Sequence, residues 1–539
     1  MSDEAGASQG LGRERAIILA GLMLGMLLGS IDQSIVSTAL PRIAGDLGGL
    51  DKLSWVVTAY LVTVTVTTPL YGKLSDIYGR SIIFETSISI FLLGSILSGL
   101  SGDIPMLSNY AGGMTQLAIF RALQGIGAGG LIAMATTILG DIFSPRERGK
   151  YMSYMMLIFG AATVGGPLLG GWLTDNYTWR WVFYINVPIG LAAILITHFT
   201  LDLPIPGKSH RIDYEGAALL VGAVASFMLV TTWGGNTYAW DSTVILGLAV
   251  AAVVLGVAFA LQELRVDEPV FPVHLLSSRT VVGVILLSLF LGSGMFGATI
   301  YLPVFLQTVL GVSATNSGLL LLPLVGGMLV TAGATGQLMT RTGRYKIFPV
   351  IGTALGVVGY YLLSTMGPET THFHSTLYMI VTGMGLGFVM PVLTVAVQNA
   401  VSRENLGVAT TSVTFSRSLG SAIGVSVFGA LLTSQLTSRL ADAFPGAGSS
   451  KMVSSGAGIS PSAIAKLPEP VRHTVVTALA NSIDTVFVAG MGILAVAFVV
   501  AVLLPELELS ETAHVSMGEG AVGEGAAEPT DGSGSSSDD

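Results

Sequence analysis

The sequence predicts an all-α membrane protein with fourteen transmembrane helices. Its 539 residues are 51% hydrophobic and only 11% charged, with a mean hydropathy of +0.73, whereas soluble domains carry about 25% charged residues. Apolar stretches of roughly 20 residues, the length that crosses a bilayer as a helix, recur along the whole chain. A membrane β-barrel would instead show short segments of alternating polarity.

The spans divide into two six-helix bundles and a linking pair. We place them, in order, at residues 16–39, 54–72, 81–101, 115–139, 151–173, 180–201, 215–233, 243–262, 280–306, 316–338, 347–367, 376–400, 409–434 and 483–504. The N-terminal bundle then covers 16–201, the two linking helices 215–262, and the C-terminal bundle 280–504 with a long outer loop at 435–482.

The two ends of the chain differ from its body. Residues 1–15 form a short cytoplasmic segment without a cleavable leader pattern, so we expect the first span to remain as an anchor. Residues 505–539 carry nine acidic side chains, no Lys or Arg, and many Gly, Ser and Ala residues. This composition is typical of a disordered, here acidic and cytoplasmic, tail. The chain has no Cys, which excludes disulfides, thiolate metal sites and cysteine nucleophiles.

Lysine and arginine gather in alternate loops. With the N-terminus inside, the inner segments hold fifteen of the 24 basic residues and the outer loops hold seven, four of them in the loop 435–482. Because cytoplasmic loops are enriched in Lys and Arg, we expect a multi-pass protein of the cell membrane with both termini in the cytoplasm.

Two charged side chains lie inside apolar stretches. Asp32 is the only ionisable residue of the first span, and Arg121 lies in the fourth. A charge at bilayer depth costs ~3 kcal/mol on insertion scales, so such residues are rarely present without a role. At 1.5 Å per helical residue, Asp32 is ~13 Å and Arg121 ~10 Å from the outer end of its span, so the two charges can share a level.

The chain also contains an internal repeat. The segment Gly72–Arg80 resembles Gly336–Arg344, with Gly, Leu, Gly and Arg at one offset of 264 residues. Three glycines with alternate spacing in span four, starting at Gly125, match three in span twelve, starting at Gly383. Two parallel halves of this kind are a transporter design, in which substrate binds between the halves near the middle of the bilayer.

Five motifs, in order, carry a resemblance to a known family. They are Ile31–Pro41 in the first span, Gly72–Arg80 after the second, Arg121–Gly127 in the fourth, Gly166–Gly171 in the fifth, and Trp179–Pro188 after it. Together they resemble the fourteen-span drug:proton antiporter branch of the major facilitator superfamily. The second half departs from the first, because it has no arginine equivalent to Arg121 and has Thr340 where Asp76 stands, so we place coupling in the first half.

The resemblance assigns roles to these residues. It implies proton coupling at Asp32 and Arg121, a conformational latch at Gly72, Asp76, Gly79 and Arg80, and an antiporter motif at Gly166, Pro167, Gly170 and Gly171. Pairing with Arg121 favours the charged form of Asp32 while desolvation opposes it, and a group held between two such effects can titrate. The structural alternatives are a static buried pair, an ordinary basic turn and ordinary helix packing.

A substrate cavity is expected between the halves, lined by Gln33, Gln124, Tyr301, Phe305, Gln307, Gln398 and Arg417. We expect a monomeric antiporter that exports amphiphilic drugs, with lipophilic cations as the first candidates, and takes its energy from the proton gradient. We expect no cofactor, no metal site, no nucleic-acid partner and no enzymatic activity. A carrier of the same superfamily for a siderophore, lipid or nutrient, or a transporter-like sensor, is the alternative. An ATP-driven pump is disfavoured, because the single Gly-Lys-Ser, at Gly207, has Asp202 where a phosphate-binding loop needs glycine.

Overall fold

The computed structural model describes residues 2–47, 53–104, 112–201, 213–235, 238–266, 269, 271, 273–312, 320–444, 464 and 467–509. These residues form an all-helical protein without a β-strand. The elements are α1 (Ser2–Leu47), α2 (Leu53–Tyr78), α3 (Arg80–Gly99), α5 (Gly113–Ile142), α6 (Pro145–Asn176), α7 (Trp181–Tyr184), α8 (Asn186–Thr200), α9 (Tyr214–Trp233), α10 (Thr243–Glu263), η2 (Val273–Ser277), α11 (Arg279–Thr308), α13 (Leu322–Thr342), α14 (Ile347–Leu363), α15 (His372–Asn399), η3 (Arg403–Asn405), α16 (Leu406–Ala443) and α19 (Glu469–Leu503).

The described helices account for the fourteen expected spans. Twelve helical segments have the length and hydropathy to cross a membrane. The other two places are taken by α2, which contains polar residues and Pro69, and by α14, an apolar helix of 17 residues. The span expected at 180–201 is built from the short α7 followed by α8.

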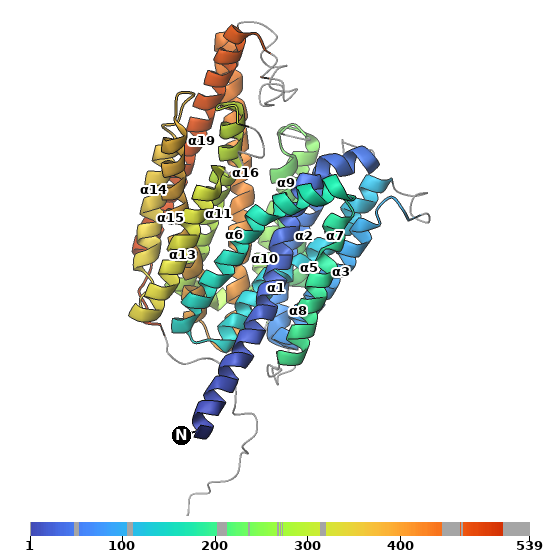
Figure 1. The fold of residues 1–539 in the computed structure, drawn as a ribbon, viewed down its shortest axis with the longest axis vertical. Helices are drawn as coiled ribbons and strands as arrows, with labels where there is room; N and C mark the ends of the chain where they lie inside the picture. The colour runs from blue at the N-terminus through green and yellow to red at the C-terminus, as the bar shows by residue number, and fades with distance from the viewer. Residues whose placement is uncertain are drawn as a thin grey trace, which may run out of the picture.

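Six helices before the linking pair and six after it pack in the same way, as the two groups in Figure 1 show. In the N-terminal half, α5 contacts α2 and α3, and α1 contacts α6 and α8. In the C-terminal half, α15 contacts α13 and α14, and α11 contacts α16 and α19. The linking helices α9 and α10 pack on each other, and α9 also contacts α2 and α16. The internal repeat of the sequence therefore corresponds to a repeated packing pattern.

Matching glycines hold the fourth helix of each half against its neighbours. A Cβ atom at Gly127 would lie 2.3 Å from the backbone nitrogen of Phe91 on α3. The equivalent atom at Gly385 would lie 2.6 Å from the backbone nitrogen of Gly356 on α14. No side chain fits at either place, so these glycines are required for the close approach of the helices.

Both copies of the loop motif carry a glycine with a positive φ angle. Gly79 separates α2 from α3 with φ 96°, and Gly343 ends α13 with φ 68°. Positive φ angles cost glycine little and other residues more, which explains why both copies carry glycine here. We call the end of the bundle that carries these two turns the basic end.

The two halves are joined at the basic end. Ser153 on α6 donates a hydrogen bond to the carbonyl of Ala332 on α13 at 2.8 Å. Gln398 on α15 donates to the carbonyl of Thr136 on α5 at 2.9 Å. All four residues lie within ten residues of the end of their helix that faces the basic end.

Helix α6 leaves the C-terminal half as it runs away from the basic end, and its oblique course is visible in Figure 1. Gly160 faces Leu329 of α13, but Gly166 faces Ser34 of α1 in its own half. Cβ atoms at Gly165, which precedes Gly166, and at Gly171, nearer the far end of α6, would have no atom within 4 Å. In these contacts α6 therefore meets α13 on the basic side of the helix and α1 farther along.

Helices α16 and α19 extend beyond the span of a bilayer at the opposite end, where Figure 1 shows them rising above the other helices. They contain 38 and 35 residues, or ~57 and ~52 Å at 1.5 Å per residue, against ~30 Å for the hydrocarbon core. Residues 435–443 and 469–482, expected in a loop, are helical. Polar side chains end the hydropathy signal there, but they do not end the helical backbone.

Five residues of the expected tail, 505–509, pack on the basic end of the C-terminal half. The Tyr345 hydroxyl donates to the carbonyl of Pro505 at 2.8 Å, and the backbone N–H of Leu509 donates to the carbonyl of Gly343 at 3.2 Å. Leu509 is buried. Residues 510–539 lie outside the described part of the chain, so the expectation of a disordered tail remains a prediction for them.

Candidate functional site

The Asp32 carboxylate lies at the centre of a buried polar cluster. It accepts a hydrogen bond from Arg121 Nη1 at 2.6 Å on one oxygen. On the other oxygen it accepts from Gln124 Nε2 at 2.8 Å and from Asn186 Nδ2 at 2.9 Å. The same Nη1 of Arg121 also donates to Gln124 Oε1 at 2.8 Å. The structure thus brings together the two charges that the sequence placed at one level.

Two further side chains hold the donors in place. Asn186 Nδ2 lies 3.0 Å from Ser95 Oγ, and that hydroxyl donates to the carbonyl of Phe183 at 2.9 Å. The guanidinium carbon of Arg121 lies 3.9 Å from the centre of the Tyr60 ring, in the geometry of a cation–π contact. We call Asp32, Tyr60, Ser95, Arg121, Gln124 and Asn186 the Asp32 cluster.

The Asp32 cluster belongs to one half of the molecule and is closed to solvent in this conformation. Its members come from α1, α2, α3, α5 and α8, five of the six helices of the N-terminal half. Asp32 is 0% exposed and Arg121 3%. Buried Nε of Arg121 and Oδ1 of Asn186 have no hydrogen-bond partner among the described residues. The cluster therefore keeps unused donor and acceptor positions beside a fully satisfied carboxylate.

Sequence reasoning missed Tyr60, Ser95 and Asn186 and assigned Gln124 to the substrate cavity. Asn186 is the first residue of α8, and its side chain is buried. An amide at the start of an otherwise apolar span was the available signal, since buried amides require partners. The motif Trp179–Pro188 contains this residue, but one-dimensional spacing does not show that it meets α1.

A second cluster joins the halves at the basic end. Asp76 on α2 forms an ion pair with Arg80, and its two oxygens accept from the backbone N–H groups of Gly407 and Val408 at 3.2 Å each. These N–H groups begin α16, where a negative charge is favourable. Arg80 Nε donates to Asp141 Oδ2 on α5 at 2.9 Å. We call Asp76, Arg80, Asp141 and the start of α16 the Asp76 cluster.

Gly72 and Gly79, the other two residues of the expected latch, support the contact between α2 and α16. A Cβ atom at Gly72 would lie 2.9 Å from the carbonyl oxygen of Gly407, so only glycine lets α2 approach α16 this closely. Gly79 supplies the turn that brings Arg80 back toward Asp76. Asp76 thus has two kinds of partner, the guanidinium of Arg80 and the N-terminus of α16.

The two arginines of the next basic loop have different partners. Arg146 Nε donates to the carbonyl of Thr340 across the seam at 2.8 Å. Arg148 donates within its own half, to the carbonyl of Phe143 at 2.8 Å and to that of Gly140. Ser144 and Glu147 form a capping box at the start of α6, the helix that carries both arginines. Backbone carbonyls, rather than Asp76, therefore bind these guanidinium groups.

The motif of the fifth span packs mainly inside its own half. Gly166 lies against Ser34 on α1, where a Cβ atom would be 1.9 Å from the hydroxyl oxygen. Pro167 is exposed within α6 and Gly170 is buried, while Gly171 faces open space. In this conformation the segment is a bare flank beside α1 and not a contact between the halves.

Only part of the expected cavity lining has accessible surface. Gln33 is exposed, and Gln307 and Arg417 are partly exposed. The other four side chains, of Gln124, Tyr301, Phe305 and Gln398, are buried. Tyr301 and Phe305 pack in the apolar core of the C-terminal half, and Gln398 binds across the seam. These four line no accessible surface in this conformation, because their own partners enclose them.

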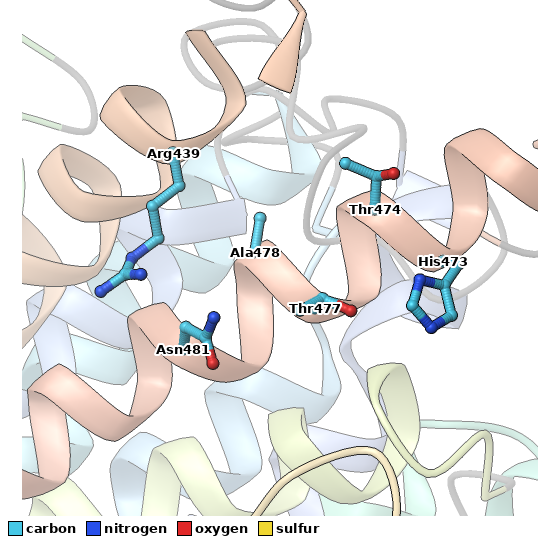
Figure 2. A pocket seen from close by; sticks show the side chains of 6 residues that line it. All are labelled: Arg439, His473, Thr474, Thr477, Ala478 and Asn481. Atoms are coloured by element: carbon cyan, nitrogen blue, oxygen red, sulfur yellow. The ribbon is translucent and has the colours of Figure 1, made fainter. Parts of the chain in front are cut away.

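A shallow pocket of about 310 Å³ lies apart from both clusters, between the extensions of α16 and α19 (Figure 2). It is lined by Arg439, His473, Thr474, Thr477, Ala478 and Asn481. Figure 2 shows the Arg439 side chain directed toward the turn of α19 that carries Asn481. Within the described ranges, no group of three or more His, Cys, Asp or Glu side chains is placed to hold a metal ion.

With this geometry described, comparison with known proteins decides the family. The profile of the Major Facilitator Superfamily matches residues 22–425. The chain belongs to the Major Facilitator Superfamily. The repeated halves, the two clusters and the linking helices are therefore features of a transporter of this superfamily and not of an enzyme.

Relatives and a solved structure agree with this assignment. The chain is 36% identical to the multidrug transporter protein MdtP of Bacillus subtilis, covering 94% of this chain and 95% of the relative. It is 40% identical to an uncharacterized MFS-type transporter of Mycobacterium tuberculosis, covering 92% and 70%. The proton:xylose symporter XylE is similar in structure, with a TM-score of 0.58 at 15% identity over 91% of this chain and 96% of XylE. At that identity the likeness concerns the fold alone.

Proposed function

We propose that this superfamily member is a proton-coupled antiporter that exports amphiphilic small molecules across the cytoplasmic membrane by alternating access. The Asp32 cluster carries the proposal, because it places a neutralised acid in the middle of the N-terminal half. The names of relatives that are multidrug transporters support the substrate class. The basic end is then cytoplasmic, both termini lie inside, and this conformation opens outward.

Proton binding at Asp32 has a physical consequence for Arg121. A protonated carboxyl no longer balances the guanidinium charge, and a buried ion pair that loses one partner costs about 3–5 kcal/mol. Arg121 retains Gln124 Oε1 and the Tyr60 ring, but neither carries a negative charge. Proton uptake is therefore favourable only together with a change that hydrates the cluster or brings another partner to Arg121. This requirement links protonation to movement.

Opening of the Asp76 cluster is the movement that we link to protonation of Asp32. Its bonds join α2 of one half to α16 of the other, so they must break when the basic end opens. The bond between Arg80 and Asp141 lies within the N-terminal half and can persist, whereas the ion pair of Asp141 with Arg403, at 3.9 Å, crosses the seam. Asp76, Arg80, Gly72 and Gly79 thus act as a latch that stabilises the state closed at the basic end.

The preference for lipophilic cations remains a prediction of the sequence. A cation would need a carboxylate near the middle of the bilayer, and among the described residues Asp32 is the one acid at that depth. Its oxygens are occupied by three donors. A cation would therefore compete with Arg121 for Asp32, which is one physical route to exchange of a drug cation for a proton.

The test is transport by purified protein in proteoliposomes with an imposed pH gradient. The probes share a dansyl-aminohexyl core and differ in a carboxylate, carboxamide or trimethylammonium head group. Wild-type protein should accumulate at least one probe against its gradient, and Asp32→Asn should abolish the dependence on the pH gradient. Asp46→Asn, which alters an exposed acid on the same helix, should leave transport unchanged. Full proton-driven transport by Asp32→Asn contradicts the proposal.

A further inference from the structure

Arg417 is a charged residue near the middle of the bilayer that neither cluster uses. It lies 11 residues after the first residue of α16. At 1.5 Å per residue this places it ~16 Å from the basic end of the helix, about halfway through a hydrocarbon core of ~30 Å. A charge at this depth is expensive, and intramembrane ionisable residues are by default candidates for function.

The Arg417 side chain has no acidic partner among the residues that the structure describes. No ion pair or hydrogen bond of its guanidinium occurs among those residues. Asp484 lies near the end of the last expected span that is opposite the basic end, and one of its carboxylate oxygens has no hydrogen-bond partner among the described residues. Asp32 is bound to Arg121, and Glu85, near the basic end of α3, lies 3.4 Å from His198. The middle of the molecule therefore carries an excess positive charge.

The backbone of Arg417 is fixed while its side chain retains accessible surface. Its carbonyl accepts from Ser421 Oγ at 2.8 Å and lies where a Cβ atom of Gly292 on α11 would stand. The side chain is partly exposed, whereas that of Arg121 is buried. The partly exposed guanidinium of Arg417 can therefore meet a molecule that enters from outside its own half.

Arg417 also lies on a helix of the seam. One face of α16 meets α2, where Thr411 lies against Gly72. The neighbouring face meets α11, where Gly420 and Gly424 lie against Leu289 and Ser293. Because α16 begins at the Asp76 cluster, rearrangement of the latch moves the helix that carries Arg417.

We propose that Arg417 binds the anionic group of a transported amphiphile, such as a carboxylate, in the C-terminal half. This inference rests on the function proposed above and names a substrate class for it. A guanidinium forms two parallel hydrogen bonds with a carboxylate, and such a bond neutralises the unpaired charge. Lipid phosphates lie at the membrane surface, about half the bilayer thickness away, so the anionic group must belong to a molecule that enters between the halves.

The experiment measures binding and transport of the three dansyl probes by the full-length protein. Binding to wild-type protein in nanodiscs is measured by equilibrium dialysis without a pH gradient, so it does not depend on coupling. We expect Arg417→Gln to weaken binding of the carboxylate probe at least tenfold and to change carboxamide binding less than twofold. Arg417→Lys, which keeps the charge, should recover part of the loss. Arg344→Gln, which removes an exposed arginine at the basic end, should bind all probes as wild type does.

The outcomes separate the two proposals. If Arg417→Gln binds the carboxylate probe as tightly as wild type, or weakens all three probes equally, the role of Arg417 is wrong. If wild type binds the trimethylammonium probe and not the carboxylate, the substrate class is wrong even when proton-driven export is observed. If the carboxylate probe depends on Arg417 for binding but no probe moves in response to a pH gradient, the proposed antiport fails and the binding site stands. Thermal melting of each variant excludes misfolding as the cause.

Discussion

The Asp32 and Asp76 clusters are both networks of a carboxylate and an arginine, but they connect different parts of the molecule. The Asp32 cluster uses five helices of one half and contains no residue from the other. The Asp76 cluster ends on backbone N–H groups of the opposite half. A network inside one rigid half can persist while the halves move, whereas a network across the seam must break. The first is suited to hold a proton and the second to report the conformation.

The strongest effect is expected when the Asp32 cluster loses its cation. Arg121→Met leaves a buried carboxylate without its ion-pair partner, which costs about 3–5 kcal/mol of stability. We expect a lower melting temperature in detergent, and partial recovery in the double variant Asp32→Asn/Arg121→Met, because the uncompensated charge is gone. Transport should stay lost in both. Arg344→Met is the exposed control. If the double variant melts lower than Arg121→Met, the two side chains do not act as a pair.

A smaller effect, on conformation and not on stability, is expected at the Asp76 cluster. Asp76→Asn removes the charge that binds the first N–H groups of α16. The state open at the basic end should gain population by about tenfold, which corresponds to ~1.4 kcal/mol. Because the chain has no Cys, a single Ser153→Cys reporter in the seam measures this by its rate of maleimide labelling.

The control for this measurement is Asp103→Asn, which removes an exposed acid paired with Arg180 inside the N-terminal half. It should leave the labelling rate unchanged. Equal labelling of the reporter with and without Asp76→Asn would show that the contact is not a latch. A large drop in melting temperature would show that the Asp76 cluster stabilises the fold itself.

The smallest effect is expected at Tyr60, whose ring contacts the Arg121 guanidinium. Tyr60→Leu removes a cation–π contact worth about 0.5–2 kcal/mol and should slow proton-driven transport several-fold. Tyr60→Phe keeps the ring face and should transport normally. If both variants are equally slow, the Tyr60 hydroxyl matters and the ring does not, and the description of the Asp32 cluster must change.

The sequence predicted the fourteen spans because hydropathy records which segments contact lipid. It placed their ends less well where helices leave the bilayer. For α16 and α19, polar residues such as Arg439 and His473 continue the helix beyond the apolar stretch, and hydropathy cannot distinguish such residues from a loop.

For the site, the sequence predicted how deep each charged residue lies along its helix. Counting residues from the span ends put Asp32 and Arg121 together, and they pair at 2.6 Å. Counting residues does not show which side of a helix faces a neighbouring helix. Phe305 and Gln398 were therefore expected in a cavity although they are enclosed by packing. Asn186 was missed because residue spacing does not show that its side of the helix meets Asp32.

The protruding ends of α16 and α19 belong to one half, so they turn with it as a single rigid arm. If α16 is a stiff rod from the Asp76 contact to the tip, release of the proposed latch at the basic end tilts the tip at the opposite end. An antibody fragment or fluorophore attached to that arm would then report the state of the basic end from the opposite side of the membrane, without entering it.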